Sequence, residues 1–163
     1  MSQLPKRQDV PPEYRWRLED LYPDQSAWDR EYDAVKARLG DITAFRGRLK
    51  DADTIRACFE LEDELSLAVE RLYVYANMKH HEDMGDPVYQ ALSDKSKKLS
   101  VEVNEALSFI APEILSLSEE QLRGLVDEPK LAKYRHTLEE LLRQKPHVLS
   151  ESEEALLAQA GNI

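Results

Sequence analysis

The residues that could bind a metal ion gather in one segment, Met-Lys-His-His-Glu-Asp-Met-Gly, at positions 78–85. His81-Glu82 matches the start of His-Glu-x-x-His, in which two histidines one helical turn apart bind zinc and the glutamate acts as general base. Position 85 is glycine, so the second histidine is missing. Adjacent histidines on a helix point about 100° apart and do not converge on one ion without other ligands. The segment therefore favours a solvated helix end.

The sequence also lacks the residue patterns of other kinds of catalytic site. A carboxylate-bridged di-iron bundle needs Glu-x-x-His, but the residues three positions before the four histidines are Asn77, Met78, Lys133 and Gln144. The chain has no Gly-x-Ser-x-Gly, and its single cysteine, Cys58, lies on an apolar helix face without a second residue to activate it. Five scattered glycines do not form a phosphate-binding loop. We therefore predict no catalytic, cofactor-binding or metal-binding residue in this chain.

The composition excludes further classes of function. A formal net charge of −10 over 163 residues opposes binding to the phosphates of nucleic acids. No apolar segment approaches the roughly 20 residues of a membrane-spanning helix, and the first residues have no apolar core of a secretory signal. The sequence therefore predicts a cytoplasmic protein that binds neither nucleic acid nor membranes.

The elements that would position any site are helices. Residues 1–23 contain four prolines and are expected to form an extended arm, anchored by side chains such as Trp16 and Tyr22. Apolar residues spaced by three and four predict a helix from about residue 26 whose stripe continues to Leu49, with Gly40 and Gly47 as candidate positions for a bend or an end. A long helix is predicted from 53 to 81. Asp86 and Pro87 provide an N-cap and a first helical position, so a third, antiparallel helix is expected to run to about Pro112.

Shorter helices are predicted in the last third of the chain. Ser118 with Gln121 reads as a capping box for a helix to about residue 126, and Pro129 precedes another that carries Leu138. A second capping box, Ser150 with Glu153, opens a helix over residues 151–160. An isolated helix of about ten residues is marginal in water, so the chain reads as the front part of something longer. The expected fold is all-α, an irregular helical bundle built around a long antiparallel helical hairpin.

Several segments, in this order, resemble the N-terminal region of the oligoendopeptidase F family of zinc metallopeptidases. The resemblance covers almost the whole chain and is carried by Arg15-Trp16-Arg17-Leu18-Glu19-Asp20-Leu21-Tyr22-Pro23, Leu72-Tyr73-Val74-Tyr75-Ala76, Phe109-Ile110-Ala111-Pro112-Glu113-Ile114-Leu115, Tyr134-Arg135-His136-Thr137-Leu138-Glu139 and Lys145-Pro146-His147-Val148-Leu149-Ser150. None of these segments is a catalytic motif.

The resemblance implies a parent enzyme that hydrolyses short peptides with a zinc ion held far C-terminal of any residue present. The chain would then be an inactive N-terminal fragment that shapes the substrate cleft and needs a C-terminal catalytic domain as partner. Its expected divisions are an arm at 1–23, a helical hairpin bundle at 24–111, and the truncated start of the family's N-terminal helical segment at 112–163. Exposed apolar surface would favour a homo-oligomer.

Two alternatives remain open. A free-standing helical interaction or dimerisation module would explain the acidity and the missing site, but not the late capping box. A small metal-binding protein would use four neighbouring residues of the cluster described first: His80, His81, Glu82 and Asp83.

Overall fold

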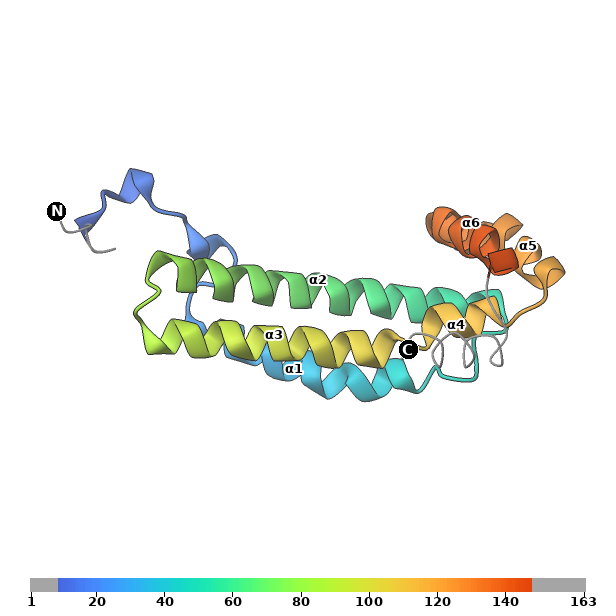
Figure 1. Ribbon diagram of the computed structural model, residues 1–163, viewed down its shortest axis with the longest axis horizontal. Helices are drawn as coiled ribbons and strands as arrows, with labels where there is room; N and C mark the ends of the chain where they lie inside the picture. The colour runs from blue at the N-terminus through green and yellow to red at the C-terminus, as the bar shows by residue number, and fades with distance from the viewer. Residues whose placement is uncertain (1–8, 148–163) are drawn as a thin grey trace, which may run out of the picture. The chain divides into compact units, whose positions relative to one another are not determined.

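The computed structural model describes residues 9–147, and within that range it contains helices and turns but no strand (Figure 1). The predicted all-α class is confirmed. The described residues divide into two compact units, 9–45 with 58–108 and 46–57 with 109–147. Within residues 9–147, no helix combines the length and the apolar composition that crossing a membrane requires.

The first unit begins with the arm, which contains two short 3-10 helices, η2 (Pro12–Tyr14) and η3 (Leu18–Asp20). Leu18 and Tyr22 are buried and anchor it. Trp16, which was also expected to anchor the arm, is 52% exposed. The arm is therefore held at its C-terminal end.

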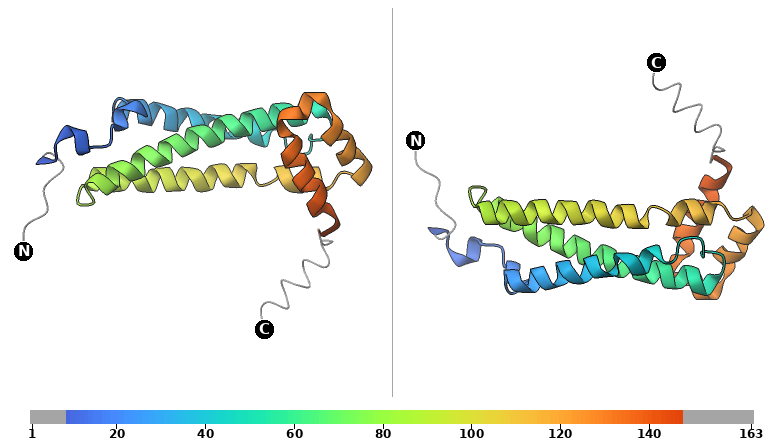
Figure 2. Two further views of the ribbon diagram at one scale, coloured as in Figure 1. Left: turned by 90° about the horizontal axis from the view of Figure 1, so that it is seen from above. Right: turned by 90° about the horizontal axis from the view of Figure 1, so that it is seen from below.

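The rest of this unit consists of α1 (Gln25–Thr43), α2 (Ala52–Glu82) from residue 58 onward, and α3 (Pro87–Leu107). α2 and α3 run antiparallel, as the sequence predicts, and α1 lies against α3 (Figures 1 and 2). Asp24 caps α1 by accepting a hydrogen bond from the Ala27 N–H at 2.8 Å, and Asp86 caps α3 by accepting one from the Val88 N–H at 2.8 Å. These caps fix where the helices begin.

The first and third helices end earlier than their apolar stripes predict. The first helix stops at Thr43, and the chain turns through Gly47, whose φ of +79° suits a residue without a Cβ atom. Leu49 is buried after this turn instead of continuing the stripe. The third helix stops at Leu107, and Pro112 does not end it but lies in the first turn of α4 (Ile110–Leu115). A proline is tolerated there because the first-turn N–H groups have no partner within the helix.

The second unit contains the start of α2, α4, α5 (Glu119–Asp127), η4 (Pro129–Tyr134), α6 (Arg135–Gln144) and η5 (Lys145–His147). The predicted capping box is confirmed: Ser118 Oγ accepts from the Gln121 N–H at 3.1 Å, and Gln121 Oε1 accepts from the Ser118 N–H at 2.8 Å. The capping box at Ser150 and the helix predicted over residues 151–160 lie outside the described residues. The core of the second unit contains Leu49, Ile55, Ile114, Leu122, Leu131 and Leu138.

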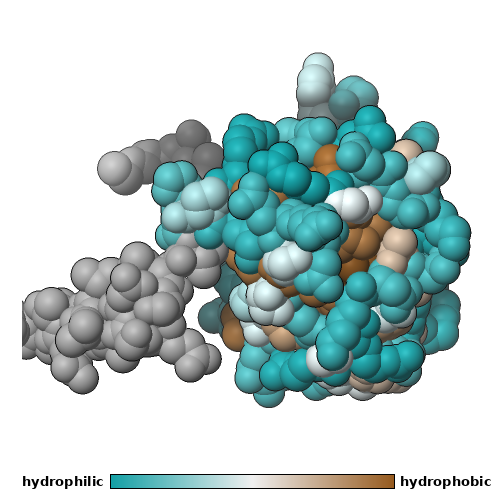
Figure 3. Space-filling model, turned by 90° about the vertical axis from the view of Figure 1, so that its right-hand side faces the viewer, coloured by the Kyte–Doolittle hydropathy of each residue, from teal (hydrophilic) through white to brown (hydrophobic). Residues whose placement is uncertain are grey.

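The side of the molecule where α5 and α6 lie is mostly hydrophilic, with hydrophobic residues visible between the polar ones (Figure 3). A hollow of about 360 Å³ on these two helices has the side chains of Arg123, Glu139, Leu142 and Arg143 around it.

A carboxylate fixes the turn between α1 and α2. Glu113 accepts hydrogen bonds from the N–H groups of Gly47 and Leu49, both at 2.7 Å. Replacing Glu113 with alanine is expected to lower the free energy of unfolding by about 1–3 kcal/mol, because two backbone donors lose their charged acceptor. Urea unfolding measures the change. Glu113→Gln, which keeps one acceptor oxygen, should lose less, and exposed Glu139→Ala should lose almost nothing; equal losses in all three would contradict this role.

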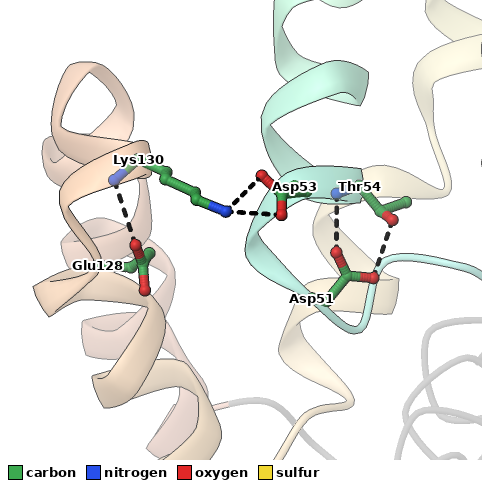
Figure 4. A network of polar contacts seen from close by, with 5 residues as sticks. All are labelled: Asp51, Asp53, Thr54, Glu128 and Lys130. Carbon is green, nitrogen blue, oxygen red and sulfur yellow. Dashed lines mark hydrogen bonds and ion pairs between the residues drawn. The ribbon is translucent and has the colours of Figure 1, made fainter.

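The first turn of α2 carries a second carboxylate contact (Figure 4). Asp51 accepts from the backbone N–H of Thr54 at 3.0 Å and from its hydroxyl at 2.8 Å. Next to it, the Lys130 ammonium contacts both oxygens of Asp53 at 2.9 and 2.7 Å. The hydrogen bonds from the Thr54 backbone and side chain lower the pKa of Asp51 below its usual 3.8.

This lowered pKa predicts a pH dependence of stability. A carboxyl group whose pKa is lower in the folded state stabilises fully above its unfolded pKa, and that contribution is lost as the pH falls through the folded pKa. The Asp51→Asn variant is therefore expected to be less stable than the unsubstituted chain at a pH of about 5. The difference between their free energies of unfolding should shrink as the pH falls to about 2. Thermal unfolding across this range measures the deficit. Exposed Asp127→Asn is the control, and a deficit for Asp51→Asn that stays constant with pH would contradict the assignment.

Candidate functional site

The four residues with metal-binding side chains lie at the C-terminal end of α2. The rings of His80 and His81 are tilted with centroids 6.0 Å apart, and His81 is exposed. Asp83 accepts a hydrogen bond from the Gly85 N–H at 3.1 Å, so its carboxylate stabilises the turn to α3. No group of three or more His, Cys, Asp or Glu side chains in residues 9–147 is placed to hold a metal ion. The described residues do not fit a zinc site.

Glu82 has a separate role from the histidines. Its side chain is 6% exposed, and one oxygen lies 3.9 Å from the ammonium of Lys79 one turn earlier. Lys79 in turn lies over the rings of Tyr75 and Tyr89, 5.8 and 5.9 Å from their centroids. A positive charge over aromatic faces is stabilised by the ring quadrupole. The glutamate therefore belongs to a charged and aromatic cluster instead of a metal centre.

The other residues that the sequence offers for chemistry are a cysteine, a histidine and a group of acids on α2. Cys58 is buried, as expected for a structural thiol. His136 has a side chain that is 82% exposed, with its Nε2 3.9 Å from Glu140. In the acidic part of α2, burial raises the pKa of Glu62 and the charge of Asp63 raises it further, while Glu64 pairs with Arg38 at 2.6 Å. Glu62 is half-buried, whereas Asp63 and Glu64 are exposed.

A polar cluster holds the arm onto the hairpin in the first unit. The Arg71 guanidinium lies 5.3 Å from the centre of the Tyr22 ring and donates a hydrogen bond to the Leu21 carbonyl at 3.2 Å. Its Nη1 lies 3.8 Å from a Glu31 oxygen. Burial, followed by the adjacent Glu31 carboxylate, raises the pKa of Tyr22. The phenol thus stays protonated, and the cluster positions the arm.

Between this arm and the ends of α2 and α3 lies a hollow of about 540 Å³, which we call the arm pocket. Its lining includes charged and aromatic side chains: Arg15, Trp16, Arg17, Lys79, Glu82 and Tyr89. Five of its eight lining residues are charged, whereas small-molecule sites are lined mainly by apolar and aromatic side chains. Sequence reasoning missed it because the pocket exists only once the arm is folded, although Arg15-Trp16-Arg17 is visible as a basic and aromatic triplet.

Comparison with known proteins adds the evidence that the side chains do not supply. A family model described as Oligopeptidase F matches residues 113–163. Oligopeptidase PepF of Bacillus subtilis is 39% identical over 164 residues, which cover 99% of this chain and 24% of that protein. Group B oligopeptidase PepB of Streptococcus agalactiae is 35% identical and is matched over 96% of this chain and 26% of its own length.

Solved structures agree with these matches. Oligoendopeptidase-F from Enterococcus faecium superposes with a TM-score of 0.67 at 34% identity, covering 85% of this chain and 28% of that one. A peptidase candidate from Chlamydophila abortus superposes with a TM-score of 0.87 at 25% identity, covering 97% of this chain and 27% of that one. The chain spans about a quarter of the length of these relatives. It belongs to the oligopeptidase F family and corresponds to the N-terminal region of its members.

Proposed function

We propose that this chain is the N-terminal helical part of a zinc metallopeptidase that hydrolyses short peptides, and that it forms one wall of the substrate cleft. The single observation that carries the proposal is the match over nearly the whole chain to oligopeptidases of which it covers about a quarter. Zinc would be bound by residues beyond this chain, and hydrolysis would depend on them. The helices would contribute by excluding folded proteins from the cleft, so that specificity comes from what cannot enter.

We assign no catalytic step to the histidines of α2, since their neighbouring carboxylates contact Lys79 and Gly85. The partners proposed for the parent protein are an oligopeptide substrate and the catalytic domain that follows. A cytoplasmic location is part of the same proposal, and cell fractionation tests it.

The proposal is tested with the protein encoded by the complete natural reading frame that contains this chain. This protein should bind about one zinc per chain and cleave a quenched fluorescent peptide of about ten residues. A chelator should abolish the cleavage. Intact folded protein should not be cleaved. A full-length product that cleaves nothing, or that cleaves peptides equally well after complete removal of metal, would contradict the proposal.

A free-standing interaction module is not favoured, because nearly the whole of this chain matches relatives that are named oligopeptidases. Self-association of the 163-residue chain remains a prediction that rests on exposed apolar side chains such as Leu67 and Val101. Sedimentation over a concentration series tests it. A single monomeric species throughout the series would contradict it.

A further inference from the structure

Exposed apolar side chains gather at the end of the first unit where α2 turns into α3. Met84, in the turn, is 71% exposed, and Val88, in the first turn of α3, is 50% exposed. The arm, with exposed Tyr14 and Trp16, lies at the same end of this unit (Figures 1 and 2). We call the surface formed by these four residues the hairpin end. It holds four of the seven large apolar side chains that are exposed among the described residues.

A groove of about 310 Å³ opens beside Val88, between the start of α1 and the first turns of α3. Four of its six lining residues are apolar: Pro87, Val88, Ala91 and Leu92. Leu92 is buried, whereas Ala91 is exposed. The apolar lining favours an apolar group as occupant, because burial removes apolar surface from water.

The two polar lining residues of the groove, Gln25 and Lys95, provide no net charge for a ligand. The Lys95 ammonium lies 3.8 Å from an oxygen of Asp29 and 5.9 Å from the centre of the Tyr32 ring. Gln25 is uncharged. Recognition of a charged ligand is therefore not favoured here, and contact with an apolar surface is.

The area of the hairpin end separates the possible partners. Two helix ends, each about 10–12 Å across, offer roughly a few hundred Å², less than the roughly 800 Å² per partner that a stable complex of separate proteins buries. Two surfaces of one chain meet at a high effective concentration, so a smaller contact suffices. This chain covers 24% and 26% of two relatives, which leaves about three-quarters of such a protein to supply the second surface.

We infer that the hairpin end is the surface by which this chain contacts the remaining part of its parent protein, and that an apolar side chain of that part fills the groove. This inference rests on the proposed function for the identity of the partner, and it adds where the contact lies. A second copy of this chain is the other candidate occupant, and the test separates the two.

Oxidation of Met84 by hydrogen peroxide, followed by mass spectrometry, tests the contact. The rate is compared between the 163-residue chain and the protein encoded by the complete natural reading frame. Because oxidation requires access to the sulfur, Met84 should react at least about fivefold more slowly in the complete protein. Equal rates in the two proteins would overturn the inference. A rate that falls in the 163-residue chain as its concentration rises would assign the surface to a second copy and would also overturn it.

Two matched substitutions of exposed alanines test the groove. Ala91→Glu should be tolerated in the 163-residue chain, because the new carboxylate precedes Lys95 by one turn, a favourable order on a helix. In the complete protein it should restore rapid oxidation of Met84, since a charge would then face the apolar side chain. Ala37→Glu, on the exposed surface of α1, should leave the slow rate unchanged. Circular dichroism of both variants checks folding, and identical oxidation rates in the two would overturn the assignment of the groove.

Zinc content and peptide cleavage are measured on the same complete protein, so the two proposals can fail separately. A protein that cleaves peptides while Met84 oxidises as fast as in the 163-residue chain contradicts this inference alone. A protein that protects Met84 but cleaves nothing contradicts the proposed function and leaves the contact surface supported.

Discussion

Replacing Trp28 with alanine is expected to lower the free energy of unfolding by about 3–5 kcal/mol, the usual cost of removing a large buried side chain. Trp28 is fully buried, stacks on Tyr32 with ring centroids 5.3 Å apart, and donates from Nε1 to the Leu72 carbonyl at 2.9 Å. This one side chain therefore joins α1 to the middle of α2. Its loss leaves a cavity and removes a buried hydrogen bond at the same time.

Urea unfolding followed by circular dichroism measures this effect. Trp28→Phe keeps most of the apolar area but not the donor, so it should cost about 1–2 kcal/mol. Trp16→Ala is the matched control, because that indole is half exposed and its removal should cost clearly less. A loss for Trp28→Ala no larger than that of the control would show that Trp28 does not hold α1 on the hairpin.

Leu138→Ala is expected to destabilise the second unit by about 2–5 kcal/mol. Leu138 is fully buried on α6, the helix that contacts α4, α5 and η4. A cavity at this position removes packing from several short elements that have little helical stability of their own. In the Leu138→Ala variant, the amide hydrogens of α5 and α6 should exchange faster than in the unsubstituted chain. The amide hydrogens of α3 should be affected less.

The control for this substitution is Leu67→Ala on the outer face of α2. Leu67 is 60% exposed, and the same change of side chain there should stay within about 0.5 kcal/mol. Equal destabilisation by the two substitutions, or protection of α5 and α6 that is unchanged in Leu138→Ala, would contradict the central position of Leu138.

The sequence predicted the elements that carry local signals. Asp86 before Pro87 and Ser118 with Gln121 are short-range caps, and the helices begin where these residues stand. The length of α2 followed from apolar spacing alone, with predicted bounds of 53 and 81 and observed bounds of 52 and 82. Such signals depend on neighbours in the chain and are independent of tertiary packing.

The features that sequence reasoning missed depend on distant residues. Pro112 was expected to end a helix, but the carboxylate of the next residue, Glu113, binds the turn at Gly47 and Leu49, and a new helix starts before it. The arm pocket likewise needs Arg17 and Tyr89 brought together from separate elements. The predicted divisions at residues 23 and 111 remain predictions, whereas the family resemblance is confirmed by the matched relatives.

The central claim is that the residues for peptide hydrolysis lie outside this chain. The most direct test is an assay of the purified 163-residue chain with a quenched fluorescent peptide, with added zinc and with a chelator. We predict no cleavage above the buffer rate under either condition. Cleavage that requires zinc and stops with the chelator would contradict the claim.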